Sequence, residues 1–209
     1  MSESEIVLIC ASPRRKGTSA MLLERIKKIT GGEIVFLPQK GSMDELIKKM
    51  GDSSTIVISG PTYINTYPAR LCEFIEEASK AGSFSNQKLY GIINGGMPYF
   101  HTHEHGLSYL KLFARENKLS WMGGFVLVGG AILDGQPLEK HLNHKKTVPC
   151  FNQFIQCIKK GIPASEQLYK ETEPAIPVFV TYILAKVLTF RVSKHLKEYG
   201  HNPNDLLHF

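Results

Sequence analysis

The chain has 209 residues, of which 43% are hydrophobic and 21% charged, and its formal net charge is +6. A chain of this length can bury one substantial core, and its mixture of apolar and charged residues excludes a mostly disordered protein. The positive charge favours an anionic partner, which can be a nucleotide phosphate, a nucleic acid or a membrane surface.

The cysteines and the first residues bear on the compartment. The four cysteines form no CxxC pair, and Cys10 lies in an apolar run where a thiol behaves as a small hydrophobe. The acidic start, Met1 to Glu5, lacks the basic region and long apolar segment of a signal peptide. We therefore expect reduced cysteines and a cytoplasmic protein.

The first third of the chain alternates between strand and helix patterns. The apolar run from Glu5 to Cys10 ends in a turn and predicts a buried strand. Apolar residues then recur at helical spacing from Thr18 until Gly31-Gly32 ends the helix. The same reasoning predicts a strand over 33–37, a helix over 43–50 and a strand over 55–59 that closes at Gly60-Pro61.

The alternation continues to residue 160. We predict a helix over 68–79, a strand over 88–93 ending at Asn94-Gly95-Gly96, a helix from Leu107 to about Asn117, a strand over 124–128 and a covering helix over 141–160. Five strands that alternate with helices call for a parallel sheet covered on both faces, because right-handed crossovers place each helix against the sheet.

Beyond Gly161 the alternation stops. Prolines at 163, 174 and 177 precede a long apolar helix predicted from about Val178 to Tyr199. We therefore expect a domain over 1–161 and a helical extension over 162–209. The apolar stretch contains Lys186 and is shorter than the roughly 20 residues that cross a bilayer, so no transmembrane segment is expected. The extension can pack on the body or on a second subunit, or lie on a membrane surface.

A loop of unusual composition follows the first strand. Residues 12–19 read Ser-Pro-Arg-Arg-Lys-Gly-Thr-Ser and place hydroxyls, cations and a glycine directly before a helix. A helix N-terminus offers unpaired N–H groups to an anion, Gly17 lets the backbone approach closely, Thr18 and Ser19 can cap the helix and donate hydroxyls, and Arg14 can add a charged contact. The composition predicts a phosphate site, although a capped helix beside solvated cations would have the same sequence. Neither GxGxxG nor GxxxxGK[ST] occurs there, which disfavours a dinucleotide fingerprint and a Walker loop.

This loop, followed after Ala20 by Met-Leu-Leu, resembles the phosphate loop of the NADPH-dependent FMN reductase family. A second resemblance lies after the third strand, in Gly60-Pro61-Thr62-Tyr63-Ile64 and the helix that follows. With Asn94-Gly95-Gly96, the resemblance covers about residues 5–160. It implies a flavodoxin-like three-layer α/β sandwich, with a five-stranded parallel sheet of order 2-1-3-4-5, helices on both faces and a C-terminal helical extension.

The resemblance also implies which residues bind FMN. The ribityl phosphate would contact Ser12, Arg14, Gly17, Thr18 and Ser19. The isoalloxazine ring would lie between Pro61, Thr62, Tyr63 and Ile64 on one side and Asn94, Gly95 and Gly96 on the other. Tyr63 can instead be an ordinary interface tyrosine, and Ile64 stands where many members carry a bulky aromatic residue. The cysteines do not form the cluster that an iron–sulfur centre needs, so we expect no such centre.

Three histidines, His101, His103 and His105, invite a metal interpretation. If the segment starts a helix, His101 and His105 share a face while His103 points elsewhere, so one ion could not use all three. We expect no metal site and place these histidines at the pocket rim or on the surface, where they can line the substrate opening.

The function implied is an NAD(P)H-dependent FMN reductase. It would take a hydride from NADPH or NADH and pass electrons to a small-molecule acceptor such as a quinone, a flavin, a nitro or azo compound or a metal chelate, with no general acid or nucleophile from the protein. The alternatives are a flavodoxin-like electron carrier, which the positive charge disfavours, and a non-catalytic flavin-binding module. No nucleic-acid motif accompanies the cations, and we expect a homodimer or higher homo-oligomer.

Overall fold

The strands form one parallel sheet, as the alternating pattern predicts, and their order β2-β1-β3-β4-β5 is the one that the family resemblance implies. The computed structural model describes residues 6–63, 65–82, 84–174 and 178–200. The strands are β1 (Ile6–Cys10), β2 (Glu33–Phe36), β3 (Thr55–Pro61), β4 (Lys88–Asn94) and β5 (Ser120–Leu127). The chain reverses its direction of travel across the sheet between β2 and β3, which places the switch point between β1 and β3.

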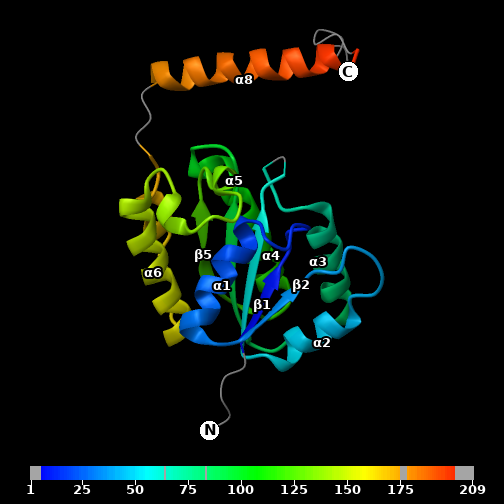
Figure 1. The fold of residues 1–209 in the computed structure, drawn as a ribbon. Helices are drawn as coiled ribbons and strands as arrows, with labels where there is room; N and C mark the ends of the chain where they lie inside the picture. The colour runs from blue at the N-terminus through cyan, green and yellow to red at the C-terminus, as the bar shows by residue number, and fades with distance from the viewer. Residues whose placement is uncertain (1–5, 64, 83, 175–177, 201–209) are drawn as a thin grey trace. The chain divides into compact units, whose positions relative to one another are not determined.

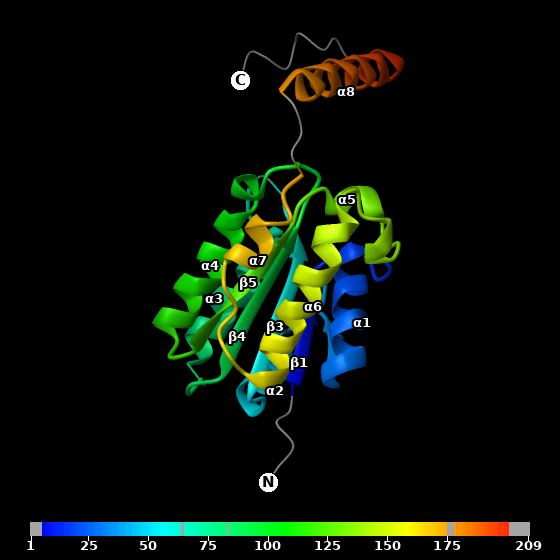
Figure 2. The same ribbon diagram turned by 90° about the vertical axis from the view of Figure 1, so that its left-hand side faces the viewer.

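Helices cover both faces of this sheet (Figures 1 and 2). Helix α1 packs on β1 and β3 and also contacts α6, while α4 packs on β4 and β5 from the opposite face beside α3. The longer helices are α1 (Thr18–Thr30), α2 (Asp44–Asp52), α3 (Ala69–Ala81), α4 (Glu104–Glu116), α6 (His144–Lys160) and α8 (Val178–Glu198). The short helices are η1 (Phe100–Thr102), α5 (Gly130–Leu133), η2 (Leu138–Lys140) and α7 (Gln167–Lys170).

The core lies on both faces of the sheet, because the central strands are buried along nearly their whole length. Every residue of β1 is buried, and β3 is buried from Thr55 to Gly60. Aromatic rings fill the space under α6, where Phe125 packs edge-on against Phe151 with centroids 5.0 Å apart. A continuous buried core fixes the strand ends, and these ends position the loops at the carboxyl edge of the sheet.

The C-terminal boundary lies later than expected. The chain divides into a unit of residues 1–174 and a unit of residues 175–209, whereas the sequence pattern places a boundary at Gly161. Residues 162–174 belong to the first unit because Leu168 and Tyr169 are buried and α7 contacts β5 and α6. The second unit contains α8, whose extent agrees with the helix expected from Val178, and no helix in the described part of the chain is long and apolar enough to cross a membrane.

Candidate flavin-binding site at the carboxyl edge of the sheet

The residues expected to bind a cofactor come together in one pocket at the carboxyl edge of the sheet. The pocket has a volume of about 150 Å³ and lies between the loops after β1, β3 and β4. It is lined by Ser12, Arg14, Thr18, Ser19, Pro61, Thr62, Tyr63, Asn94, Gly95, Gly96 and Ala131. Of the residues named from the sequence, Gly17 does not line it and Ile64 lies outside the described residues.

The N-terminus of α1 points its unpaired groups at this pocket. Gly17 occupies the N-cap position and no side chain caps the helix, so Thr18 and Ser19 do not have the capping role expected from the sequence. Among the described residues, none accepts a hydrogen bond from the backbone N–H groups of Thr18, Ser19 and Ala20. These are three of the N–H groups that every helix leaves without an internal partner, and they carry the positive end of the helix dipole.

The hydroxyl of Thr18 forms hydrogen bonds within the protein. Its Oγ1 donates a hydrogen bond to the carbonyl oxygen of Gly130 over 2.8 Å and accepts one from the N–H of Gly135 over 3.3 Å. The single hydrogen of this hydroxyl is therefore engaged by the protein in this structure, and the predicted contact of Thr18 with a phosphate stays a prediction. The contact joins the phosphate loop to the segment after β5.

Asn94 joins the three loops of the pocket. Its side-chain amide donates to Ser19 Oγ over 2.8 Å and to the carbonyl oxygen of Gly60 over 3.0 Å. The main-chain carbonyl oxygen of Asn94 accepts a hydrogen bond from the N–H of Thr62 over 2.7 Å. Asn94 is buried, and its bonds hold the loops after β1, β3 and β4 in one arrangement before any ligand binds.

The loop after β3 offers a polar atom without a partner. Thr62 Oγ1 is buried, and no described residue forms a hydrogen bond with it. Buried hydroxyls are rarely left unpaired, because the lost hydrogen bond with water costs about 1–3 kcal/mol. The adjacent Tyr63 is 52% exposed, so an aromatic side chain and an unsatisfied hydroxyl lie side by side at the pocket.

One cation of the loop, Arg14, forms an ion pair with the segment after β5. Arg14 Nη1 lies 2.6 Å from Asp134 Oδ1, and both side chains are largely exposed. Arg15 lies over the ring of Phe36, 4.9 Å from its centroid, so Arg14 is the arginine of this loop that lines the pocket. Other N–H groups of the Arg14 guanidinium are left for an anion.

The segment after β5 contributes to the site, which sequence reasoning missed. Ala131 lines the pocket and donates its N–H to the carbonyl oxygen of Gly95 over 3.2 Å. Gly135 has φ of +82° and lies so close to the loop after β1 that a Cβ atom would fall 1.9 Å from the carbonyl oxygen of Lys16. The signal was present in Gly129-Gly130 and Gly135, since glycines at a strand end mark a tight turn or a close backbone approach.

His103 differs from expectation. The histidine is 2% exposed, so it lies neither at a rim nor on the surface, whereas His101 and His105 are exposed. Its ring packs against Gly95, where a Cβ atom would lie 2.2 Å from His103 Cε1, and this space exists only because residue 95 is glycine. Burial lowers the pKa of His103 below the ordinary histidine value. In the described part of the chain, no three His, Cys, Asp or Glu side chains are grouped to hold a metal ion.

The cysteines are all free in the described residues, and burial raises the pKa of Cys10 to about 11. At neutral pH this thiol is protonated and unreactive, as expected for a small apolar side chain in a strand.

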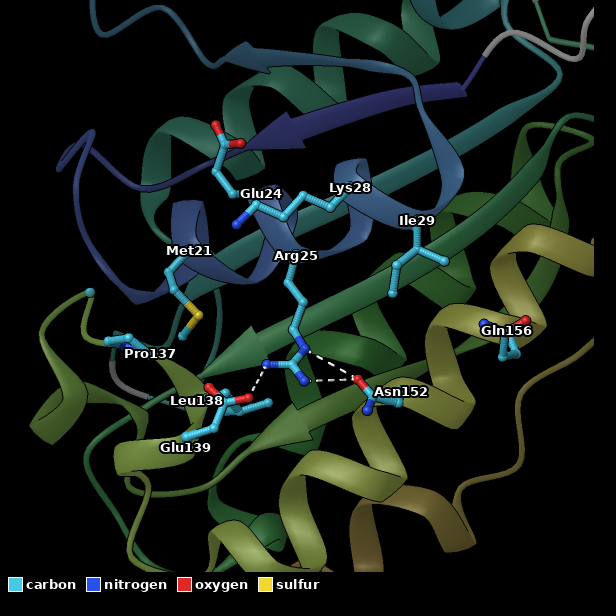
Figure 3. Close-up of a pocket in the computed structure, with 11 residues that line it drawn as sticks. Met21, Glu24, Arg25, Lys28, Ile29, Pro137, Leu138, Glu139, Asn152 and Gln156 are labelled. Carbon is cyan, nitrogen blue, oxygen red and sulfur yellow. Dashed lines mark hydrogen bonds and ion pairs between the residues drawn. The ribbon is translucent and has the colours of Figure 1, made fainter.

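A larger hollow lies elsewhere, between α1 and α6 (Figure 3). Its volume is about 580 Å³, and Arg25 in it is held by Asn152, 3.0 and 3.2 Å away, and by Glu139, 2.7 Å away. None of the residues singled out from the sequence lines this hollow. Its arginine is already satisfied by protein partners, so the smaller pocket at the switch point is the better candidate for a ligand.

The residues present fit FMN. The uncapped N-terminus of α1 suits a phosphate dianion, and Thr62 Oγ1 and Tyr63 offer a polar atom and an aromatic face to a heterocyclic ring. The pocket also lies where doubly wound α/β proteins bind their ligands.

No family model matches the sequence, and a search of curated proteins finds no match either. Solved structures are similar at low identity. An NADH:FMN oxidoreductase is 15% identical with a TM-score of 0.59, over 82% of this chain and 96% of that one. General stress protein 14 from Treponema denticola, solved in complex with FMN, is 13% identical with a TM-score of 0.56, over 74% of this chain and 99% of that one.

The Trp repressor binding protein from Bacillus subtilis is 14% identical with a TM-score of 0.55, over 78% of this chain and 100% of that one. At these identities the likeness concerns the fold, and it agrees with the strand order and the two helical layers described above. The chain therefore has the flavodoxin-like fold.

Proposed function

We propose that the chain is an FMN-dependent NAD(P)H oxidoreductase of the NADPH-dependent FMN reductase family. The observation that carries the proposal is the pocket in which three loops converge on the uncapped N-terminus of α1. Proteins of similar fold include an NADH:FMN oxidoreductase, a stress protein solved with FMN and an azoreductase from Bacillus anthracis, which supports the same class of activity.

The phosphate of FMN would be held by the free backbone N–H groups of Thr18, Ser19 and Ala20, together with Ser12 and Arg14. These groups combine the helix dipole with a charged side chain, the arrangement that favours a dianion. The ring would be bordered by the loop 61–63 and by the loop 94–96.

FMN, when bound, supplies hydride chemistry at its N5 position, first with the nicotinamide and then with the acceptor. The chain's residues bind and orient the cofactor. The side-chain amide of Asn94 keeps the loops in register, Thr62 Oγ1 offers a hydrogen-bonding atom to the ring, and Tyr63 covers an apolar surface. The pocket needs no protein nucleophile or general acid for this role. The acceptor would be a quinone, a flavin, a nitro or azo compound or a metal chelate.

The test is visible absorption of the purified protein, alone and after addition of FMN, followed by NADPH or NADH under argon. We expect a bound flavin spectrum that bleaches on addition of one of the nucleotides and returns when a quinone is added. A flavin spectrum that ignores both nucleotides would indicate an electron carrier. A protein that takes up no FMN would contradict the proposal and leave a different phosphate ligand for the pocket.

We also propose that the protein is a cytoplasmic homodimer or higher homo-oligomer. The support for the oligomeric state lies in α8, taken by itself: Phe179, Tyr182 and Phe190 are 60–70% exposed on a helix of 21 residues. Apolar side chains of this size on one helix are typical of a surface that another chain covers.

A further inference from the structure

His103 lies directly behind the loop after β4. The residue follows η1 and forms the N-cap position of α4, and it is 2% exposed. Its imidazole occupies the space that a side chain at residue 95 would need. Gly95 and Gly96 line the pocket on the side that faces the proposed cofactor. The imidazole of His103 packs against the other side of this loop and supports it.

A hydrogen bond fixes the imidazole to this loop. Nε2 of His103 lies 3.1 Å from the carbonyl oxygen of Met97, which also accepts a hydrogen bond from the N–H of Gly129 over 2.9 Å. A carbonyl oxygen only accepts, so Nε2 must carry the hydrogen, which assigns the tautomer. Nδ1 then has a bare lone pair, and this atom is buried without a partner among the described residues.

The segment that carries His103 is itself anchored. The N–H of Phe100 donates to Glu173 over 2.9 Å, and the hydroxyl of Tyr169 donates to Glu104 over 3.2 Å. Residues on both sides of His103 are thus tied to the segment that follows α6. An imidazole held in this way can act as a fixed support rather than as a mobile side chain.

Close packing brings α4 near enough for this contact. At Gly106, a Cβ atom would lie 2.3 Å from Ile93 Cδ1, so a larger residue there would require the Ile93 side chain to move. The sequence therefore combines two glycines, Gly95 and Gly106, with one buried histidine between them.

We propose that His103 is a positioning residue that fixes the Gly95–Met97 wall of the pocket and thereby sets the affinity for FMN. The proposal rests on the function proposed above. His103 does not line the pocket, so it acts through the backbone of the loop and not by touching the cofactor. Pre-ordering a binding loop raises affinity because the ordering cost is met before the ligand arrives.

The experiment compares His103→Gln with His103→Asn in the full chain. Both side chains are polar amides, but the glutamine amide nitrogen can reach the position of Nε2 and donate to Met97, whereas the shorter asparagine cannot. A third variant, His103→Leu, keeps apolar volume and removes the donor. FMN affinity is measured by quenching of flavin fluorescence, and amide hydrogen exchange at Gly129 and Ala131 is measured in the FMN-free protein.

We expect the Asn and Leu variants to bind FMN about tenfold more weakly, the effect of one lost hydrogen bond, with faster exchange at Gly129. The Gln variant should stay within about threefold of the parent protein. Equal affinities and exchange rates for Gln and Asn would overturn the inference while leaving the proposed function intact. Failure of the parent protein to bind FMN would instead overturn the proposed function, and this inference with it. If the Leu variant does not fold, the comparison of the two amides still decides.

Discussion

Arg14 has an intramolecular partner that a bound phosphate would have to share or displace. The Arg14–Asp134 pair is 2.6 Å long, with side chains 63% and 69% exposed. Exposed ion pairs contribute about 0–1 kcal/mol, whereas a hydrogen bond to a charged group contributes about 1.5–3 kcal/mol. The balance therefore favours the phosphate contact.

We accordingly expect Arg14→Ala to weaken FMN binding by about 10- to 100-fold. Fluorescence titration of FMN measures the effect. Arg15→Ala is the matched control, because it removes the same charge from the same loop but from a side chain that lies over Phe36. Equal losses in both variants would mean that only the net charge matters, contrary to the contact proposed for Arg14.

Two buried histidines predict how stability depends on pH. Burial lowers the pKa of both His103 and His141 below the ordinary value, so both are neutral in the folded protein at pH 7. In the unfolded chain they take up protons near pH 6.5, so the unfolded state binds more protons below that pH. The free energy of unfolding should therefore fall as the pH drops below about 6.5, by up to about 1.4 kcal/mol per pH unit for each histidine.

Urea denaturation of the FMN-free protein between pH 7.5 and 5 measures this dependence. His103→Gln removes one of the two titrating groups and should flatten the curve. Identical curves for the parent protein and His103→Gln would show that His103 does not contribute.

The segment after β5 and the loop after β1 behave as one element although more than 110 residues separate them. The N–H of Gly135 donates to Thr18 Oγ1, and the backbone of Gly135 lies against the carbonyl oxygen of Lys16. This contact needs glycine for two reasons, its φ of +82° and the lack of space for a Cβ atom.

Gly135→Ala should therefore lower the free energy of unfolding by about 2–4 kcal/mol, through backbone strain and displacement of the segment. Gly41→Ala is the control, because Gly41 has a similar φ of +85° but no atom within 4 Å of its Cβ position. Its cost should be the strain alone, about 1–2 kcal/mol. Urea denaturation measures the free energy of unfolding of both variants, and the difference between them gives the contribution of the Gly135 contact. Equal losses in the two variants would contradict the close approach of Gly135 to Lys16.

At the scale of the whole molecule, the boundary at Pro174 predicts which shortened chain still folds. A chain shortened to residues 1–174 keeps α7, with Leu168 and Tyr169 in the core, and should fold and bind FMN. Without α8 it should be monomeric, whereas the full chain should be a dimer or a higher oligomer. Light scattering after size exclusion measures both masses.

A chain shortened to residues 1–161 is the comparison for this experiment. It loses the buried side chains of Leu168 and Tyr169, and the apolar burial lost should destabilise it by several kcal/mol. A dimeric 1–174 chain, or a monomeric full chain, would contradict the role proposed for α8.

The sequence by itself determined the alternation of strands and helices, because each apolar run and each helical repeat is a local pattern with its own period. It also predicts an anion site at residues 12–19, since the hydroxyls, cations and glycine of this loop lie together in the chain. The strand starting at Ser120, before the expected Gly124, and the helix starting at Glu104, before Leu107, show that local patterns fix the ends of elements less well than their cores.

Only the tertiary structure decided which distant residues complete the site. The pairing of Arg14 with Asp134, the entry of Ala131 into the pocket and the burial of His103 behind Gly95 all join segments that have no local relation. The same holds for residues 162–174, because their sequence shows no regular strand or helix pattern although Leu168 and Tyr169 are buried in the core. Contacts of this kind depend on how the sheet brings its loops together, so they cannot be predicted from the local periodicity of the sequence.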